Sequence, residues 1–216
     1  MTFENPHFVS NRNPFNYEKV EQINRDTSTA WLSLEEITQQ LNLFDDESQD
    51  AYLRSVELAT RMAIEDYLGM SIYPVTYRVY YGAFTGGTEV SLDLPEVSQA
   101  SQSSAAITIV SVQYYNSASP PTLVTVAANQ YFYDPSGNKV IVSGLPNEIN
   151  TQISNPITIT YTANANPIGL YPVVKQAGLM LLTHIYNNRS NTTETKLNEI
   201  PFGVAALLRP YKNLVM

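Results

Sequence analysis

The sequence contains no cysteine among its 216 residues. Disulfide bonds, catalytic thiolates and zinc sites with thiolate ligands are therefore excluded. Charged residues are also scarce, at 15% of the chain against about a quarter in ordinary soluble proteins. The longest strongly apolar helical stretch lies between Lys175 and Arg189 and is too short to cross a bilayer. The first residues lack the basic and apolar regions of a signal peptide, so we expect a soluble protein made and used inside a cell, with no membrane partner.

Positive charge is missing from a whole third of the chain. Between Arg78 and Lys139 there is no lysine or arginine, and the formal net charge of the chain is −8. Phosphate binding needs clustered cations. We therefore expect no specific binding of nucleic acid.

Motifs for catalysis are also missing. The sequence has no G-x-S-x-G, no glycine-rich phosphate loop before a helix and no H-E-x-x-H. His184 is interpreted as a hydrogen-bonded histidine of a helical core; its pairing through space with His7 and a carboxylate, to hold a metal, is the alternative. Asp134 and Asn138 could bind calcium, but turn chemistry explains both residues. We expect no enzymatic activity, no cofactor and no metal.

Tyrosine, in contrast, is abundant, with 15 residues. Tyrosine is enriched at protein–protein interfaces because its body is apolar and its tip is polar. It is also common in β-rich domains. The two interpretations are compatible, and together they favour a subunit that buries much of its surface in an assembly.

Two helices are predicted after a polar, aperiodic arm over residues 1–30. Ser33 and Glu36 form a capping box, which opens a short helix. A longer helix runs from the acidic residues at 45–47 to Gly69, which is placed to end it. In that helix the apolar stripe expected to face the core is made of Tyr52, Val56, Ala59, Ala63 and Tyr67.

A charged stripe recurs at the same spacing on another face of the longer helix. Its signs alternate, so neighbouring side chains form opposite-charge pairs. We interpret it as a ladder of ion pairs on a solvated face or at a contact between subunits. The candidates for an inter-subunit contact are Arg54, Glu57, Arg61 and Glu65.

The pattern changes to alternating, β-branched and aromatic strands over residues 74–163. We expect an antiparallel β module there, with a type I turn at Asp134–Asn138. The predicted strands are 75–81, 90–94, 106–115, 122–126, 131–133, 140–142 and 156–162.

A third helix is predicted from Pro172 to Arg189, apolar almost all round and therefore buried on several sides. The fold class is α+β: a small helical bundle of three main helices, with an inserted antiparallel β module and extended N- and C-terminal arms. The bundle covers residues 31–73 and 172–191, and residues 192–216 form a C-terminal docking tail.

The last sixteen residues contain no acid, and about half of those that are not cations are apolar or aromatic. Such a segment either closes the core of its own domain or docks into another chain. A chain stopped at Asn198 separates these alternatives, because it stays folded only if the segment docks elsewhere. The candidate docking residues are Pro201, Phe202, Gly203, Val204, Leu207, Leu208, Arg209, Pro210 and Tyr211.

Four stretches resemble one known family. They are 31–36 (Trp-Leu-Ser-Leu-Glu-Glu), 52–69 ending in Ile-Glu-Asp-Tyr-Leu-Gly, 174–189, and 201–211 with Pro-Phe-Gly-Val and Leu-Leu-Arg-Pro-Tyr. Together they resemble the head–tail connector (adaptor) proteins of tailed bacteriophages and gene-transfer particles. The arm before Trp31 departs from the usual pattern of that family.

The resemblance implies a homo-oligomeric ring, typically of twelve copies, in the neck of a virion that assembles in the host cytoplasm. The ring lies beneath the portal protein, extends the DNA channel and attaches the next neck or tail protein. DNA passes through it without specific binding, and the C-terminal tail docks on the portal. The alternatives are another neck or tail-completion protein, or a β-rich module that binds receptors or carbohydrates.

Overall fold

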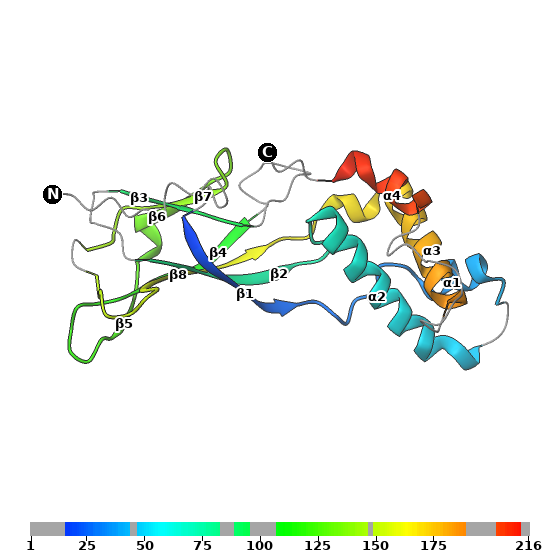
Figure 1. Ribbon diagram of the computed structural model, residues 1–216, viewed down its shortest axis with the longest axis horizontal. Helices are drawn as coiled ribbons and strands as arrows, with labels where there is room; N and C mark the ends of the chain where they lie inside the picture. Colours follow the sequence, from blue (N-terminus) through cyan, green and yellow to red (C-terminus); the bar gives the residue numbers. More distant parts are fainter. Residues whose placement is uncertain are drawn as a thin grey trace. The chain divides into compact units, whose positions relative to one another are not determined.

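The computed structural model describes residues 16–43, 47–82, 89–95, 107–146, 149–188 and 202–212. The chain divides into two compact units (Figure 1). The strand unit consists of Met1–Arg25 and Pro74–Asn164, and the helical unit of Asp26–Tyr73 and Ala165–Met216. Helices and antiparallel sheets thus occupy separate units, which confirms the predicted α+β class.

The strand unit contains two antiparallel sheets. The larger sheet has the order β1-β2-β8-β4-β5, and the smaller has the order β3-β7-β6. All seven strands predicted between residues 74 and 163 are present, and no strand end is shifted by more than one residue. The strands are β1 (Tyr17–Arg25), β2 (Val75–Tyr81), β3 (Val90–Asp93), β4 (Ile107–Tyr115), β5 (Leu123–Thr125), β6 (Tyr131–Asp134), β7 (Lys139–Val142) and β8 (Ile157–Ala163).

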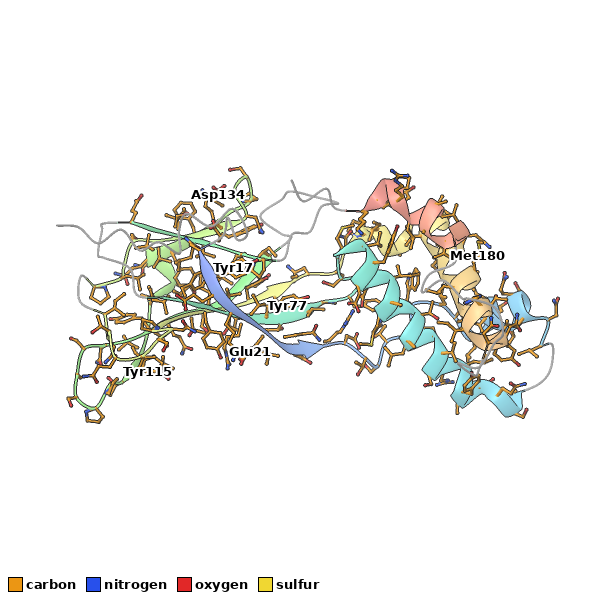
Figure 2. The ribbon with its side chains drawn as sticks, viewed as in Figure 1. Tyr17, Glu21, Tyr77, Tyr115, Asp134 and Met180 are labelled. Atoms are coloured by element: carbon orange, nitrogen blue, oxygen red, sulfur yellow. The ribbon has the colours of Figure 1, made fainter. Side chains whose placement is uncertain are left out.

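Alternation along the strands builds one core from both sheets. Val79 and Ile159 face each other across β2 and β8, and both are fully buried. Leu92 of β3 and Val140 of β7 fill the same core from the smaller sheet. Tyr77, labelled in Figure 2, lies with its ring centroid 5.6 Å from that of Tyr161. Several tyrosines therefore serve this core rather than an interface.

Residues 1–30 were predicted to be an arm, and for residues 17–25 that prediction is wrong. Strand β1 pairs with β2 along its whole length and forms an edge of the larger sheet. Asn16, just before it, also bonds to β3: its Nδ2 donates to the Ser91 oxygen at 2.6 Å. Two register shifts, near Glu18 and Ile23, break the two-residue period, and most of the strand is exposed. The sequence therefore lacks the alternation that reveals a strand. Residues 1–15 of the predicted arm lie outside the described residues.

The predicted turn at Asp134–Asn138 joins β6 to β7. The Asp134 carboxylate accepts hydrogen bonds from the Ser136 hydroxyl at 2.6 Å and from its backbone N–H at 2.9 Å. These bonds lower the pKa of Asp134. Asn138 adopts a left-handed backbone conformation, with φ at 48°, and its side chain donates to the Leu94 oxygen. Both residues therefore have turn roles, as expected.

The helical unit is built from two segments that flank the longer segment of the strand unit, Pro74–Asn164. Ser33 and Glu36 form the predicted capping box of the first helix, and Gly69 ends the second with φ at 68°. Both predictions are confirmed. The helices are α1 (Leu34–Leu41), α2 (Asp50–Leu68), α3 (Pro172–Asn187) and α4 (Phe202–Leu208), with short 3-10 turns η2 (Glu47–Gln49), η4 (Pro167–Leu170) and η5 (Arg209–Tyr211).

Helix α3 starts at Pro172 as predicted, but it is not buried on several sides. Val174, Ala177 and Leu181 face the core, whereas Val173 and Met180 are more than a third exposed. Gly178 also lies on the core face, where a Cβ atom would come within 2.6 Å of the Trp31 ring. The all-round apolar sequence of α3 therefore covers a core on one side and leaves apolar surface on the other.

Candidate interaction surfaces

The charged stripe of α2 lies inside the helical unit. Glu57, Arg61 and Glu65 expose 3%, 0% and 4% of their surface. The prediction of a solvated or inter-subunit ladder is wrong for these three residues. The predicted apolar stripe was also misplaced, because Tyr52 and Ala59 are exposed. The buried stripe consists of Leu53, Val56, Glu57, Thr60, Arg61, Ile64, Glu65 and Leu68.

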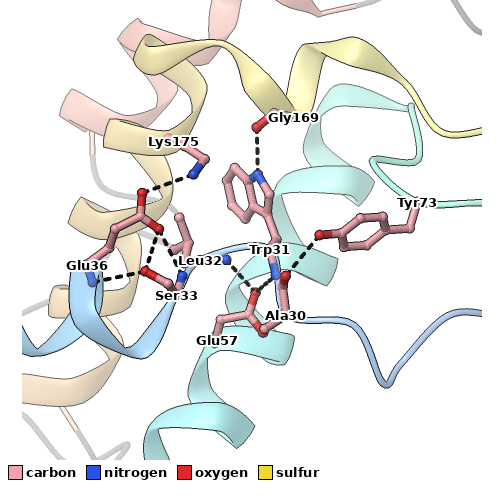
Figure 3. A network of polar contacts seen from close by, with 9 residues as sticks. All are labelled: Ala30, Trp31, Leu32, Ser33, Glu36, Glu57, Tyr73, Gly169 and Lys175. Carbon is pink, nitrogen blue, oxygen red and sulfur yellow. Dashed lines mark hydrogen bonds and ion pairs between the residues drawn. The ribbon is translucent and has the colours of Figure 1, made fainter.

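The three buried charges bind backbone groups of the chain segments next to α2. The Glu57 Oε1 accepts hydrogen bonds from the N–H groups of Trp31 at 2.9 Å and Leu32 at 3.2 Å (Figure 3). The Glu65 Oε1 accepts from the N–H of Ile72 at 2.7 Å and, more weakly, from that of Tyr73 at 3.4 Å. These two carboxylates satisfy backbone donors that would otherwise be buried without a partner.

Arg61 completes this arrangement between the two carboxylates. Its Nη1 donates to the Thr29 oxygen at 2.6 Å, its Nη2 donates to the Asp26 oxygen, and its guanidinium lies 4.9 Å from the centre of the Tyr73 ring. One turn of helix separates it from each glutamate, so a positive charge lies between two negative ones. We call Glu57, Arg61 and Glu65 the α2 clamp, because they hold the segment before α1 and the segment after α2.

Trp31 links the two halves of the helical unit. Its indole Nε1 donates to the Gly169 oxygen at 2.8 Å (Figure 3). The hydroxyl of Tyr73 donates to the Ala30 oxygen at 2.9 Å, so the segment before α1 and the segment after α2 are also bonded to each other.

An ion pair joins α1 to α3: Lys175 of α3 lies 3.0 Å from the carboxylate of Glu36. The pKa of the Glu36 carboxyl is lowered, mainly by a hydrogen bond from the backbone N–H of Ser33 and next by the hydrogen bond from Lys175.

The C-terminal segment folds onto its own unit. Helix α4 lies beside α3 (Figure 1). Val204 and Leu208 are fully buried in the same core as Leu53 and Leu182. Of the two alternatives for this segment, the structure therefore shows the one in which it closes the core of its own unit. Val204 and Leu208 are buried there and cannot anchor a partner. The prediction of an extended tail is wrong over 202–212.

The remaining predicted docking residues are more accessible. Arg209 and Pro210 are exposed, and Leu207 is half-buried. The Tyr211 ring packs edge-on against the Tyr171 ring, with 5.8 Å between the ring centroids. Gly203 lies against the terminal methyl group of Met180. Pro201 and residues 192–200 of the predicted tail lie outside the described residues, as does the side chain of Phe202.

Arg54 is the only member of the predicted inter-subunit set that is exposed. It lies on α2 and lines a cavity between α2, α1 and the segment before α1. Arg54 projects from α2 at nearly the same angle as Arg61, so the sequence alone could not have separated it from the clamp. The difference arises because the segments at Asp26–Leu32 and Ile72–Tyr73 cover Glu57, Arg61 and Glu65, whereas Arg54 is exposed.

The described residues offer little for chemistry. Within them, no group of three or more histidine, cysteine, aspartate or glutamate residues could hold a metal ion. Over the same part of the chain, no helix combines the length and apolar character needed to cross a membrane. The His184 Nδ1 lies 3.3 Å from the Asn188 side chain, in the half-buried last turn of α3.

Comparison with known proteins shows the fold. No family model matches the sequence, and no curated protein is significantly similar to it. Among solved structures, a chain from the neck of an empty gene transfer agent particle, computed with C6 symmetry, is similar with a TM-score of 0.61 and 21% identity. The similarity covers 92% of this chain and 97% of that chain.

Two further structures give the same result. A chain in the virion of a native gene transfer agent particle has a TM-score of 0.59 and 20% identity. A chain in the neck of a native particle, computed with C12 symmetry, has a TM-score of 0.59 and 19% identity. Each covers 92% of this chain and 97% of the other. This chain therefore has the fold of these particle chains, as expected from the resemblance in its sequence.

Proposed function

We propose that this protein is a structural subunit of the neck of a tailed phage or a gene-transfer particle. The observation that carries the proposal is the shared fold, which extends over 92% of this chain and 97% of a neck chain. A likeness that covers both chains almost completely leaves little room for an added catalytic domain. The role is thus structural rather than enzymatic.

In this proposal twelve copies form a ring beneath the portal protein. The ring extends the DNA channel and provides the attachment surface for the next neck or tail protein. Two of the similar chains come from neck structures computed with C6 and C12 symmetry. A ring of twelve copies is compatible with both symmetries. The absence of lysine and arginine from residues 79–138 supports a channel through which DNA slides without being held.

The accessible part of the C-terminal segment docks on the portal. Arg209 can form a forked pair with a carboxylate of the portal, and Tyr211 and Leu207 offer apolar area beside it. Val204 and Leu208 keep this surface in place, because their side chains are buried in the core and hold α4 on its own unit. Folding and docking are therefore properties of different side chains in the same segment.

A binding experiment tests this assignment. The purified protein is mixed with purified portal rings, and complexes are examined by mass photometry and electron microscopy. We expect closed rings of this protein on the portal. Arg209→Glu should abolish binding to the portal without changing the melting temperature. Lys19→Glu, which reverses an exposed cation of the strand unit, is the matched control and should leave portal binding intact.

Three results would contradict this proposal. If the protein joins the particle as one isolated copy, the ring is wrong. If rings form but bind only a tail component and never the portal, the protein is a different neck or tail-completion protein. Binding to glycans in place of portal or tail proteins would favour the carbohydrate-binding alternative.

A further inference from the structure

The helical unit contains a hollow of about 380 Å³ at the start of α3. Among its lining residues Trp31 and Ile72 are buried, whereas Ala165, Pro167 and Leu170 are exposed, so the hollow is open to solvent. Its volume lies in the range of pockets that bury most of a small ligand. We call it the Trp31 hollow.

The Trp31 hollow offers mainly apolar contact. The one charged side chain in its lining, Lys175, is already paired with Glu36 at 3.0 Å. The Tyr73 hydroxyl and the Trp31 indole N–H both donate to backbone carbonyl groups of the same unit. Figure 3 shows these side chains together with Gly169, another residue of the lining. An occupant of the hollow is therefore expected to bring apolar side chains and no charge.

Leu170 at the edge of the hollow is not covered by its own unit. It is 77% exposed, more than any other large apolar side chain in the part of the chain that the structure describes. The short turn that carries it is nevertheless fixed, because Asn166 accepts a hydrogen bond from the N–H of the buried Ile168 at 3.0 Å. An apolar side chain held in water beside an apolar hollow indicates a binding site for another segment.

The end of the described structure lies beside this hollow. The Tyr211 ring packs against Tyr171 at the start of α3, with 5.8 Å between the ring centroids. The ammonium of Lys212 lies 4.7 Å from the centre of the Tyr67 ring, near the end of α2. Lys212 also has an extended backbone, with φ at −69° and ψ at 136°. The chain therefore leaves η5 between the two places, the start of α3 and the end of α2, that flank the hollow.

The residues that follow have the composition expected of the occupant. Residues 213–216 lie outside the described residues and read Asn-Leu-Val-Met, with no charge. Four extended residues span about 13 Å, whereas neighbouring Cα atoms such as those of Tyr171 and Leu170 are about 3.8 Å apart. The hollow is thus within reach. In an extended chain alternate side chains share one side, so Leu214 and Met216 point the same way.

We propose that Leu214 and Met216 fill the Trp31 hollow of their own subunit and cover Leu170. The inference goes beyond the neck function and does not depend on it. Because residues 213–216 carry no charge, filling the hollow buries no unpaired ion. Arg209 and Lys212 are exposed and stay outside the hollow, so they remain accessible to a partner.

Disulfide trapping tests the contact, because the chain has no cysteine of its own. In Leu170→Cys/Met216→Cys we expect oxidation to consume both thiols while the protein remains a monomer in non-reducing gels. Ala51→Cys/Met216→Cys is the matched control and should keep its free thiols. Ala51 is exposed on the same unit, but it lies sixteen residues before Tyr67 on α2, a rise of about 24 Å.

Trp31 supplies a second measurement, since it is the only tryptophan of the chain and lines the hollow. Its fluorescence follows the melting of the helical unit. Leu214→Asp/Met216→Asp should lower the melting temperature by at least about 4 °C, because two apolar side chains leave the hollow. It should also increase the quenching of Trp31 by acrylamide. Val215→Asp, on the other side of the extended segment, is the control and should shift melting by less than about 2 °C.

Contrary results overturn the inference. Covalent dimers of Leu170→Cys/Met216→Cys would mean that the segment enters the hollow of another copy. Equal oxidation of this variant and the Ala51→Cys/Met216→Cys control would mean that the segment does not rest at the hollow. Equal melting temperatures of Leu214→Asp/Met216→Asp and the wild type would mean that these side chains are not buried there. The proposed function stands in all three cases, because ring formation on the portal is measured separately.

Discussion

The carboxylate of Glu57 holds the backbone N–H of Trp31 at 2.9 Å, across 26 residues of sequence. It holds the next N–H, that of Leu32, as well. Both donors are buried, and one side chain from the middle of α2 satisfies both. The start of the helical unit therefore depends on a residue whose sequence context is that of a surface ion pair.

The first prediction concerns this carboxylate. Glu57→Ala should leave two buried N–H groups without acceptors and remove one negative neighbour of Arg61. An unsatisfied buried donor costs about 1–3 kcal/mol, so we expect a loss of roughly 2–5 kcal/mol in the free energy of unfolding. Urea denaturation followed by circular dichroism measures it. Arg54→Ala, one turn earlier and exposed, is the control and should change stability by less than about 0.5 kcal/mol. An equal effect of the two variants would contradict the clamp.

The second prediction concerns the C-terminal helix. Leu208 is fully buried, so Leu208→Ala should cost about 2–5 kcal/mol. Arg209→Ala, at the exposed neighbouring position, should cost almost nothing. A chain stopped at Asn198 lacks α4 altogether and should lose much of its thermal stability, which scanning calorimetry measures. If that truncated chain melts like the full chain, α4 contributes nothing to the core.

The third prediction contrasts two glycines. At Gly178 a Cβ atom would lie 2.6 Å from the Trp31 ring, and a rigid ring held by its own hydrogen bond cannot move aside cheaply. Gly178→Ala should therefore cost about 1–3 kcal/mol despite the better helix propensity of alanine. At Gly203 the near atom is the terminal methyl of Met180, at 3.2 Å, on a flexible side chain. Gly203→Ala should be neutral or stabilising. The melting temperatures of the two variants, compared with that of the wild type, test this prediction. Equal melting temperatures of the two variants would contradict it.

The fourth prediction concerns acid stability. Hydrogen bonds from Thr29 and Ser28 lower the pKa of Asp26 well below its ordinary value. The stabilisation is present above the pKa of the unfolded chain, about 3.9, and is lost as the pH falls toward the folded-state pKa. Asp26→Asn should therefore flatten the fall in unfolding free energy between about pH 5 and pH 2. Glu35→Gln, which removes another exposed carboxylate, is the control. A wild-type slope in Asp26→Asn would contradict the prediction.

Local chemistry made much of the fold predictable. Strand β2 occupies the predicted residues, Val75–Tyr81, because alternation of β-branched and aromatic residues is strong where one face is buried. Ser33 with Glu36, and Gly69, marked helix ends because their capping bonds are local in sequence.

The errors arose where the decisive partner is distant in sequence. Strand β1 is polar because it lies at a sheet edge, and its pairing with β2 cannot be read from residues 17–25 alone. Arg61 looked like a surface charge because the carbonyl groups that it binds come from another segment, at Asp26 and Thr29. Leu208 could equally have served a partner or its own core until α3 was known to lie beside it.

The insertion of the strand unit has a consequence for biosynthesis. Helix α2 ends at Leu68, and its packing partner α3 begins only at Pro172. At roughly 5–20 residues per second, a ribosome needs roughly 5–20 s to make the intervening chain. During that time the nascent α2 has no α3 to cover Leu53, Val56 and Ile64. The strand unit can complete its own sheets first, and a chaperone that shields α2 in this interval would raise the yield of assembled subunit.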